Sequence, residues 1–151
     1  MIDALRKLSA LLSMLDIPWA TVGGANIGVR CNFYNPKDID IITSSSGVSI
    51  IHEALKEFSK GEPEISECGN IRSNYFKAVI VGFNVEIMGN PSNLIDGKWV
   101  ENSIWKNSIE IVDVYDFSLP LTSLEYEVKI NEALGNKQRV SLVKKCITNT
   151  R

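Results

Sequence analysis

Two aspartates separated by one residue are the side chains of this sequence best suited to chemistry. Asp38 and Asp40 belong to the run 37–43, and in an extended strand they share one face while the isoleucines between and after them share the other. Neighbouring carboxylates repel each other and aspartate is a poor strand residue, so the pair favours a site for a divalent cation. Magnesium binds such oxygens together with substrate phosphates. A half-exposed strand without a metal is the alternative.

A glycine pair precedes the aspartates. Gly23 and Gly24 follow an apolar strand-like run and open a short predicted helix, which gives a strand–turn–helix. Glycines let the backbone approach a ligand closely, and the amides at a helix start favour an anion such as phosphate. The spacing matches neither the Walker P-loop nor the dinucleotide-binding glycine pattern. A tight turn with no ligand is the alternative.

A third carboxylate stands alone in a later apolar strand, Phe83-Asn84-Val85-Glu86-Ile87-Met88. Neighbouring strands lie about 5 Å apart in a sheet, so Glu86 is placed to face the same site as the two aspartates. An edge-strand glutamate that points to water is the alternative. The three carboxylates together predict a metal site made of Asp38, Asp40 and Glu86.

These residues resemble the pattern of the nucleotidyltransferase superfamily typified by DNA polymerase β, and the chain is similar in size to its minimal bacterial and archaeal members. The match consists of Gly23, Gly24, Asp38, Asp40 and Glu86 and is strongest over residues 19–43. The run from Gly23 to Thr43 also resembles the tRNA-CCA-adding branch. The resemblance implies an α/β (α+β) fold, in which helices flank a mixed sheet, and Mg²⁺ (or Mn²⁺) as cofactor. The family more often has aspartate as its third carboxylate, so Glu86 is a departure.

The resemblance also implies cationic contacts to the nucleotide, beside the two glycines. Arg30 and Lys37 lie between the glycine turn and the aspartates, and Lys129 lies in a later segment similar to the family's phosphate-approaching helix. A loop charge that faces water is the alternative for Arg30 and Lys37.

The implied activity is transfer of a nucleoside monophosphate from a nucleoside triphosphate to a hydroxyl, with release of pyrophosphate. Asp38, Asp40 and Glu86 are the implied catalytic residues, and Glu86 is the expected proton acceptor. The acceptor is left open between a protein side chain, a tRNA end and a small molecule, and a second copy or a partner protein is expected to complete the site. Two alternatives are a non-catalytic nucleotide-binding or partner-binding relative, such as an antitoxin, and a metal-dependent phosphohydrolase.

Length and composition bound the remaining possibilities. With 151 residues, 44% of them hydrophobic, the chain can bury one core, so we expect one domain over 1–151 whose C-terminal helical segment covers 118–151. No run is apolar enough to span a bilayer, and the start is typical of an amphipathic helix rather than an export signal. We therefore expect a cytoplasmic protein with no membrane partner.

Charge and cysteine patterns add two expectations. Residues 129–151 hold six Lys or Arg against one Glu, in a chain of net charge −2, so this basic tail is a candidate contact for a polyanionic acceptor or the triphosphate. A solvated helix face is the alternative. Cys31, Cys68 and Cys146 are odd in number and form no Cys-x-x-Cys, which argues against a disulfide framework and a zinc ribbon.

Hydrophobic periodicity and turn residues predict the elements that position these side chains. Residues 90–108 are expected to be an irregular excursion anchored by two tryptophans. Helices are predicted at 2–15, 24–31, 48–60, from 122 or 123 to 134, and about 137–148, and strands at 18–23, 38–43, 74–81, 84–88 and 109–114.

Overall fold

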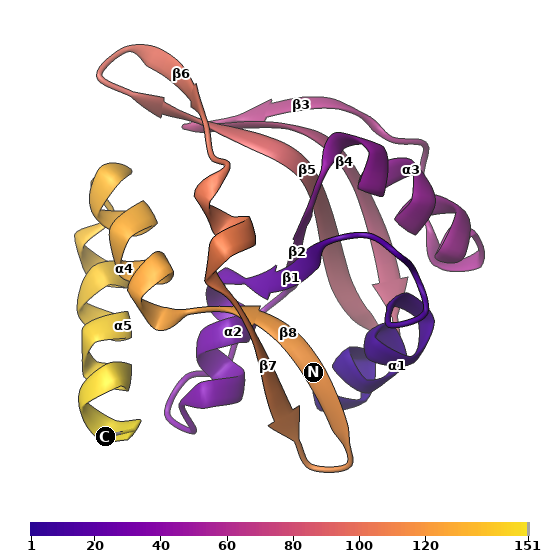
Figure 1. Cartoon of the computed structure of the whole chain (residues 1–151), viewed down its shortest axis with the longest axis horizontal. Helices are drawn as coiled ribbons and strands as arrows, with labels where there is room; N and C mark the ends of the chain where they lie inside the picture. Colours follow the sequence, from indigo (N-terminus) through magenta and orange to yellow (C-terminus); the bar gives the residue numbers. More distant parts are fainter. Residues whose placement is uncertain (151) are drawn as a thin grey trace.

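A mixed β-sheet with helices on both of its faces forms the body of the molecule (Figure 1). The computed structural model describes residues 1–150. The helices are α1 (Ile2–Leu12), α2 (Gly23–Arg30), α3 (Ser45–Ala54), α4 (Leu124–Ala133) and α5 (Lys137–Thr150), with short 3₁₀ turns at Lys56–Phe58 and Ile104–Ser108. The strands are β1 (Trp19–Val22), β2 (Ile39–Thr43), β3 (Glu64–Cys68), β4 (Ile71–Ile80), β5 (Phe83–Ile95), β6 (Lys98–Glu101), β7 (Ile109–Val114) and β8 (Phe117–Thr122).

The strand order brings together segments that are far apart in the sequence. The sheet runs β3-β4-β5-β2-β1-β8-β7, with β6 paired to β5. Strands β2 and β5 pair in parallel, as do β1 and β8, while the hairpins and the β1–β2 pair are antiparallel. The central strands β1, β2 and β5 therefore bring the glycine turn at the end of β1, Asp40 and Glu86 side by side, while Asp38, predicted to open this strand, lies just before β2. This mixed α+β architecture confirms the predicted fold class.

One face of the sheet packs against α1 and α3. Leu5 and Leu8 from α1 and Ile51 from α3 are fully buried against Ile39 and Ile41 of β2. The alternation of β2 places Asp40 and Ile42 on the opposite face, as the sequence predicted. Asp40 consequently points away from the main core.

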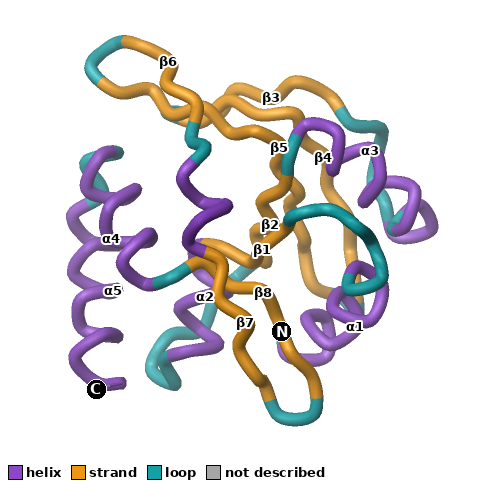
Figure 2. The backbone as a smooth tube through the Cα atoms, viewed as in Figure 1, coloured by secondary structure: helices purple, strands orange, loops and turns teal. Residues whose placement is uncertain are grey.

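The opposite face is closed by the second 3₁₀ turn and by α4. Ile42 packs there with Trp105 and Tyr126 in a smaller buried cluster. A third cluster joins α2 to α4 and α5 through Ile27 and Val143. Figure 2 shows α4 and α5 side by side at one side of the molecule, with α1 and α3 at the other.

Several sequence-based predictions require correction. The helical segment predicted over 118–151 begins only at Leu124, because residues 117–122 form strand β8, which pairs with β7 and touches β1 in parallel. Strands β3 and β6 were missed, and β5 extends to Ile95, into the predicted excursion. The start of α4 is confirmed, because the Ser123 hydroxyl accepts a hydrogen bond from the amide of Tyr126.

The cysteine prediction is also corrected. Cys31, at the end of α2, forms a disulfide with Cys146 of α5, with the two Cα atoms 5.8 Å apart, while Cys68 is free and exposed. The two residues are 115 positions apart, so sequence spacing carried no signal for their pairing. No helix within residues 1–150 is long and apolar enough to cross a membrane.

Candidate active site

Asp40 lies on the floor of a cleft between the sheet and the two C-terminal helices. In the register of the sheet, Asp40 is flanked by Val22 of β1 and Glu86 of β5. The cavity above it has a volume of about 250 Å³ and is lined by residues of β1, α2, β2, β4, β5, the loop at Asn102, α4, the turn at Asn136 and α5. The sheet thus presents a carboxylate to this open cleft.

The surroundings of Asp40 disfavour its charged form. Burial raises the pKa of Asp40 to about 7, and repulsion from Asp38, Glu86 and Glu127 adds to the rise, while Arg139 acts in the opposite direction. No hydrogen-bond donor or cationic partner within residues 1–150 contacts this carboxylate. A half-buried carboxylate that lacks a partner and lies among other negative groups is suited to bind a cation.

Asp38 lies in a bend just before β2 and is half-buried. Its charge is the second-largest contribution to the raised pKa of Asp40, so the two carboxylates act on each other. Among the described residues, no group of three or more His, Cys, Asp or Glu side chains is arranged to hold a metal ion. Magnesium is commonly bound by one or two carboxylates plus substrate phosphates, so the Asp38–Asp40 pair fits this ion without a third protein ligand.

Glu86 is next to Asp40 in the sheet and on the same face, as predicted. In this structure its Oε1 lies 3.6 Å from Nζ of Lys77, on the adjacent strand β4. Burial and then hydrogen bonding with Glu86 raise the pKa of the neighbouring Tyr75. The glutamate is therefore held toward β4, on the side of Asp40 opposite to the glycine turn.

The glycine turn approaches Asp40 closely. Gly23 has φ +63°, and a Cβ atom built on it would lie 3.1 Å from Oδ2 of Asp40. A side chain at this position would be strained both by the backbone conformation and by the carboxylate. Gly24 lies one residue further into α2, and a Cβ there would lie 3.5 Å from Nη1 of Arg139. The turn therefore carries helix-start amides between a carboxylate and a guanidinium.

Glu127 of α4 is a site residue that the sequence reasoning missed. It is almost fully buried, and its Oε1 accepts hydrogen bonds from the Gly23 amide at 2.8 Å, Asn26 Nδ2 at 3.0 Å and the Thr122 hydroxyl at 2.8 Å. The Gly23 amide thus already donates to a side chain of this protein. An acidic residue in the first turn of a helix is ordinary, so nothing in the sequence set Glu127 apart.

The predicted cationic contacts are distributed differently from the expectation. Arg30 is at the far end of α2, where it pairs with Glu110 at 2.7 Å and donates to Asn26 Oδ1, so the structure does not bring it to the cleft. Lys37 is exposed beside Asp38, and Lys129 lines a neighbouring cavity rather than the one above Asp40. Arg139 is the tail cation that lines the cleft, held by the Tyr34 hydroxyl at 3.3 Å.

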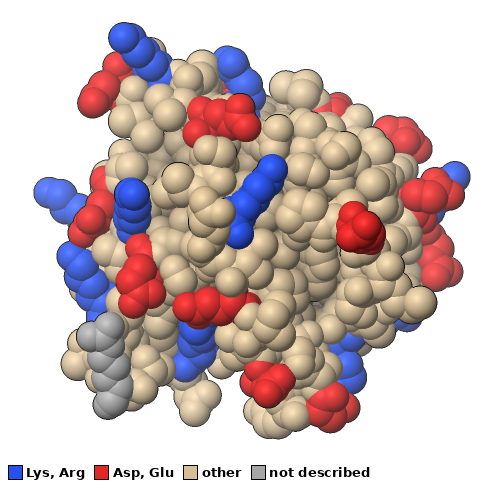
Figure 3. Space-filling view, in the orientation of Figure 1, with Lys and Arg blue, Asp and Glu red and all other residues tan. Residues whose placement is uncertain are grey.

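Two further basic residues of the tail make contacts away from the cleft. Lys144 pairs with Glu132 at 2.9 Å, and Lys145 lies over the ring of Phe33. Positive and negative side chains alternate over the face drawn in Figure 3. The net charge of the tail is therefore not concentrated on this face.

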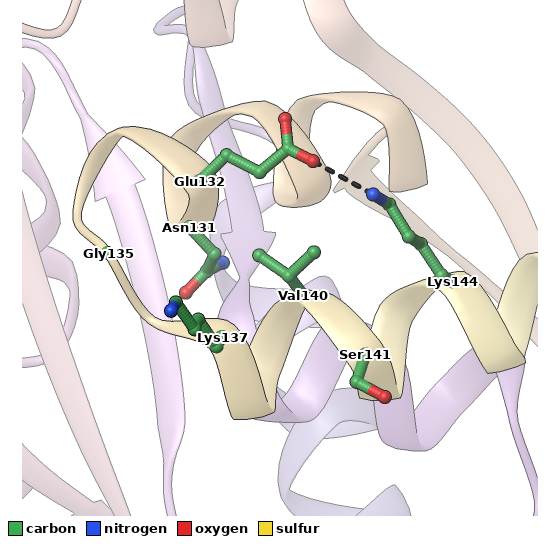
Figure 4. Close-up of a pocket in the computed structure, with 7 residues that line it drawn as sticks. All are labelled: Asn131, Glu132, Gly135, Lys137, Val140, Ser141 and Lys144. Atoms are coloured by element: carbon green, nitrogen blue, oxygen red, sulfur yellow. Dashed lines mark hydrogen bonds and ion pairs between the residues drawn. The ribbon is translucent and has the colours of Figure 1, made fainter.

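A larger cavity, of about 500 Å³, lies in a groove between α4 and α5. Figure 4 shows the Lys144–Glu132 pair across it, with Val140 and Lys137 on the α5 wall. Of its lining residues, Asn131 also lines the cleft above Asp40. The groove contains none of the predicted carboxylates, so its size does not make it the candidate active site.

Comparisons with known proteins identify the fold. No family model matches the chain, and no curated protein matches it significantly. Among solved structures, a protein from Thermotoga maritima assigned as a nucleotidyltransferase is 25% identical, with a TM-score of 0.82 over 98% of this chain and 92% of that one.

Two antibiotic-resistance proteins match more distantly. The lincosamide antibiotic adenylyltransferase LnuA, in its lincomycin-bound form, is 12% identical with a TM-score of 0.62 over 97% of this chain and 98% of that one. The antibiotic-resistance factor ANT(2'')-Ia is 12% identical with a TM-score of 0.60 over 98% of this chain and 83% of that one. With its carboxylates on adjacent parallel strands beside a glycine turn, the chain has the fold of the nucleotidyltransferases.

Proposed function

We propose that this protein transfers a nucleoside monophosphate from a nucleoside triphosphate to a hydroxyl acceptor and releases pyrophosphate. One observation carries the proposal: Asp40, half-buried and without a partner among the described residues, lies beside the glycine turn in the cleft of a nucleotidyltransferase fold. Structural carboxylates in a core are normally paired, so an unpaired one in a cleft favours a functional role.

The phosphates are assigned to the end of the cleft at the glycine turn. The N-terminus of α2 attracts an anion, and Arg139 supplies a positive charge next to Gly24. Glu127 holds the first amide of the turn and keeps the backbone in its left-handed conformation. Lys37 stays a predicted phosphate contact because it is exposed beside Asp38, and Lys129 stays one from its place at the edge of the neighbouring cavity.

Asp38 and Asp40 are the residues proposed to hold Mg²⁺ (or Mn²⁺), with Glu86 as a third candidate ligand. Such an ion neutralises phosphate charge and stabilises the attacking and leaving oxygens of an in-line displacement. Glu86 is also the proposed acceptor of the proton from the attacking hydroxyl. To act in this way its carboxylate has to exchange its contacts with Lys77 and Tyr75 for the acceptor.

The acceptor enters this proposal as a hydroxyl group only. Among the similar structures, the lincosamide adenylyltransferase holds lincomycin and ANT(2'')-Ia is in complex with adenylyl-2''-tobramycin, so small molecules are acceptors to test first. A protein side chain and a tRNA end are the other two candidate acceptors. We also propose that a second copy or a partner protein completes the site and that the protein is cytoplasmic.

The test is incubation with α-labelled and γ-labelled ATP, GTP, CTP and UTP in the presence of Mg²⁺ or Mn²⁺. Transfer of α-label to an acceptor or to the protein itself supports the proposal. Binding without transfer would support a non-catalytic relative, and release of labelled phosphate a phosphohydrolase. The variant Asp40→Asn should lose label transfer by roughly a hundredfold or more while it stays folded, as expected for loss of a charge that binds the metal. Full activity in that variant would refute the assignment.

A further inference from the structure

The end of the cleft away from the glycine turn carries two buried amides whose oxygens lack hydrogen-bond partners among the described residues. Asn93, at the end of β5, is 3% exposed, and Asn102, after β6, is 8% exposed. The Oδ1 atom of each is buried and accepts no hydrogen bond within the described residues. Buried polar atoms in folded proteins are rarely left in this state, so each one calls for an explanation.

Both amides line the cleft that contains Asp40. They also line an adjoining cavity of about 270 Å³, which shares Ile130 with the first. Asn102 is held in place by its Nδ2, which donates to the hydroxyl of Tyr126 at 2.6 Å. Asn93 and Asn102 therefore line both cavities.

Both side chains can present their amides to a ligand at little cost. Asn93 makes no side-chain hydrogen bond within residues 1–150, so its amide can turn about χ2 without breaking one. If the amide of Asn102 turns over, its oxygen can accept from Tyr126, because a phenolic hydroxyl both donates and accepts. Asn93 can thus offer both a donor and an acceptor to the cleft, and Asn102 offers whichever end of its amide is not bonded to Tyr126.

The chemistry of this end of the cleft selects an uncharged, flat group. The charged residues that line the cavity are Asp40, Glu127 and Arg139, which gather around the glycine turn. The other end is walled by Ile42, Met88, Ile71, Pro91 and Ile130. Anionic phosphates at one end and an apolar wall with free amides at the other match the two ends of a nucleotide.

Resting on the proposed function, we infer that the nucleobase binds at the Asn93–Asn102 end of the cleft and that these amides read its hydrogen-bonding edge. The free oxygens favour a base with an exocyclic amino group next to a ring nitrogen acceptor, as in adenine or cytosine, over uracil. An asparagine amide pairs with the amino group and ring nitrogen of adenine through two hydrogen bonds. Asn93 and Asn102 are thus specificity-determining residues.

Equilibrium binding in Mg²⁺ tests the inference, with ATP, CTP, UTP and inorganic tripolyphosphate as probes. The protein should bind ATP roughly tenfold or more tightly than tripolyphosphate and about fivefold more tightly than UTP, as the loss of one or two hydrogen bonds would give. In Asn93→Leu and Asn102→Leu, ATP affinity should fall by about five- to tenfold, since each variant loses one base contact. Tripolyphosphate affinity should not change.

A stability measurement separates recognition from structure. Because Asn93 makes no internal side-chain hydrogen bond within the described residues, Asn93→Leu should keep the melting temperature of the natural protein or raise it. The matched control is Asn84→Leu, an exposed asparagine of the same strand, which should alter neither binding nor melting. Asn93→Ala and Asn102→Ala replace the leucine variants if those fail to fold.

The outcomes distinguish the two proposals. If the asparagine variants bind ATP as the natural protein does, or lose tripolyphosphate affinity to the same extent, the base-reading inference is wrong. Equal binding of UTP and ATP would refute the preference for an amino-bearing base. If neither ATP nor tripolyphosphate binds the natural protein in Mg²⁺, the proposed function itself fails.

Discussion

Replacement of Glu127 tests whether one buried oxygen holds the glycine turn in place. Three hydrogen bonds converge on a single atom, Oε1, which accepts from Gly23, Asn26 and Thr122. In Glu127→Gln, the amide oxygen can occupy the same position and accept the same bonds. Only the charge is lost, so we expect a cost of about 1 kcal/mol in the free energy of unfolding.

Glu127→Ala removes the acceptor and leaves a small cavity. The Asn26 amide keeps its bond to the Thr122 carbonyl at 2.8 Å, so the Gly23 amide and the Thr122 hydroxyl are the donors that lose their side-chain acceptor outright. An unsatisfied buried donor costs roughly 1–3 kcal/mol, and the cavity adds to this, so we expect a total of about 3 kcal/mol. The difference between the two variants isolates the contribution of the oxygen.

Urea unfolding measures both costs. With a slope of about 2 kcal/mol per molar urea, Glu127→Ala should lower the midpoint by about 1.5 M and Glu127→Gln by about 0.5 M. The control is Glu132→Ala on the same helix, whose surface pair with Lys144 is worth less than about 1 kcal/mol. Equal midpoints for the glutamine and alanine variants would refute the idea that the Oε1 contacts stabilise the turn.

Three further predictions follow from the site and its surroundings. Gly23→Ala should cost about 1–2 kcal/mol of stability from the left-handed backbone alone and should lower nucleotide affinity, because the new Cβ would lie 3.1 Å from Asp40 Oδ2. The pKa of Asp40 is raised from 3.8 to about 7 in the folded protein, so the metal-free protein should lose roughly 4 kcal/mol of stability as pH rises from about 4 to about 8. The variant Asp40→Asn should not show this loss. Purified without reductant, the denatured protein should expose one titratable thiol, Cys68, and reduction should reveal Cys31 and Cys146 and lower the melting temperature.

The glycine prediction has a control variant, and the pH and thiol predictions each have a result that would contradict them. Gly61→Ala should have little effect, because its backbone is not left-handed and a Cβ there meets nothing within 4 Å. For the pH series, the direction follows from linkage: the folded state binds more protons than the unfolded state between the two pKa values, so stability falls as pH rises through that window. A stability that rises over the window would contradict it, as would three free thiols in the unreduced protein.

The sequence predicted those parts of the site that depend on local pattern. Strand alternation at 39–43 is a short-range property, so it correctly separated Ile39 and Ile41 from Asp40. The parallel pairing of β2 with β5 placed Glu86 beside Asp40 because the register of the sheet aligned them. The glycine turn followed from backbone freedom, and the observed φ of Gly23 agrees with it.

The parts that depend on packing between distant segments could not be predicted in this way. Arg30 was favoured because it is near the aspartates in sequence, yet α2 is a helix of eight residues and so places its last residue about 10 Å from its first. Its charge is instead satisfied by Glu110. Sequence proximity is a poor guide to spatial proximity wherever a helix intervenes.

The C-terminal helices explain why the remaining site residues were invisible in the sequence. Helix α4 begins immediately after β8, which lies beside β1, so Glu127 in the first turns of α4 reaches the glycine turn at the end of β1. Helix α5 then packs on α2, where Cys146 meets Cys31, and this docking carries Arg139 to Gly24. The end of the cleft proposed to bind the phosphates is thus assembled by two contacts of high sequence separation, and its electrostatics depend on how α4 and α5 dock rather than on any motif.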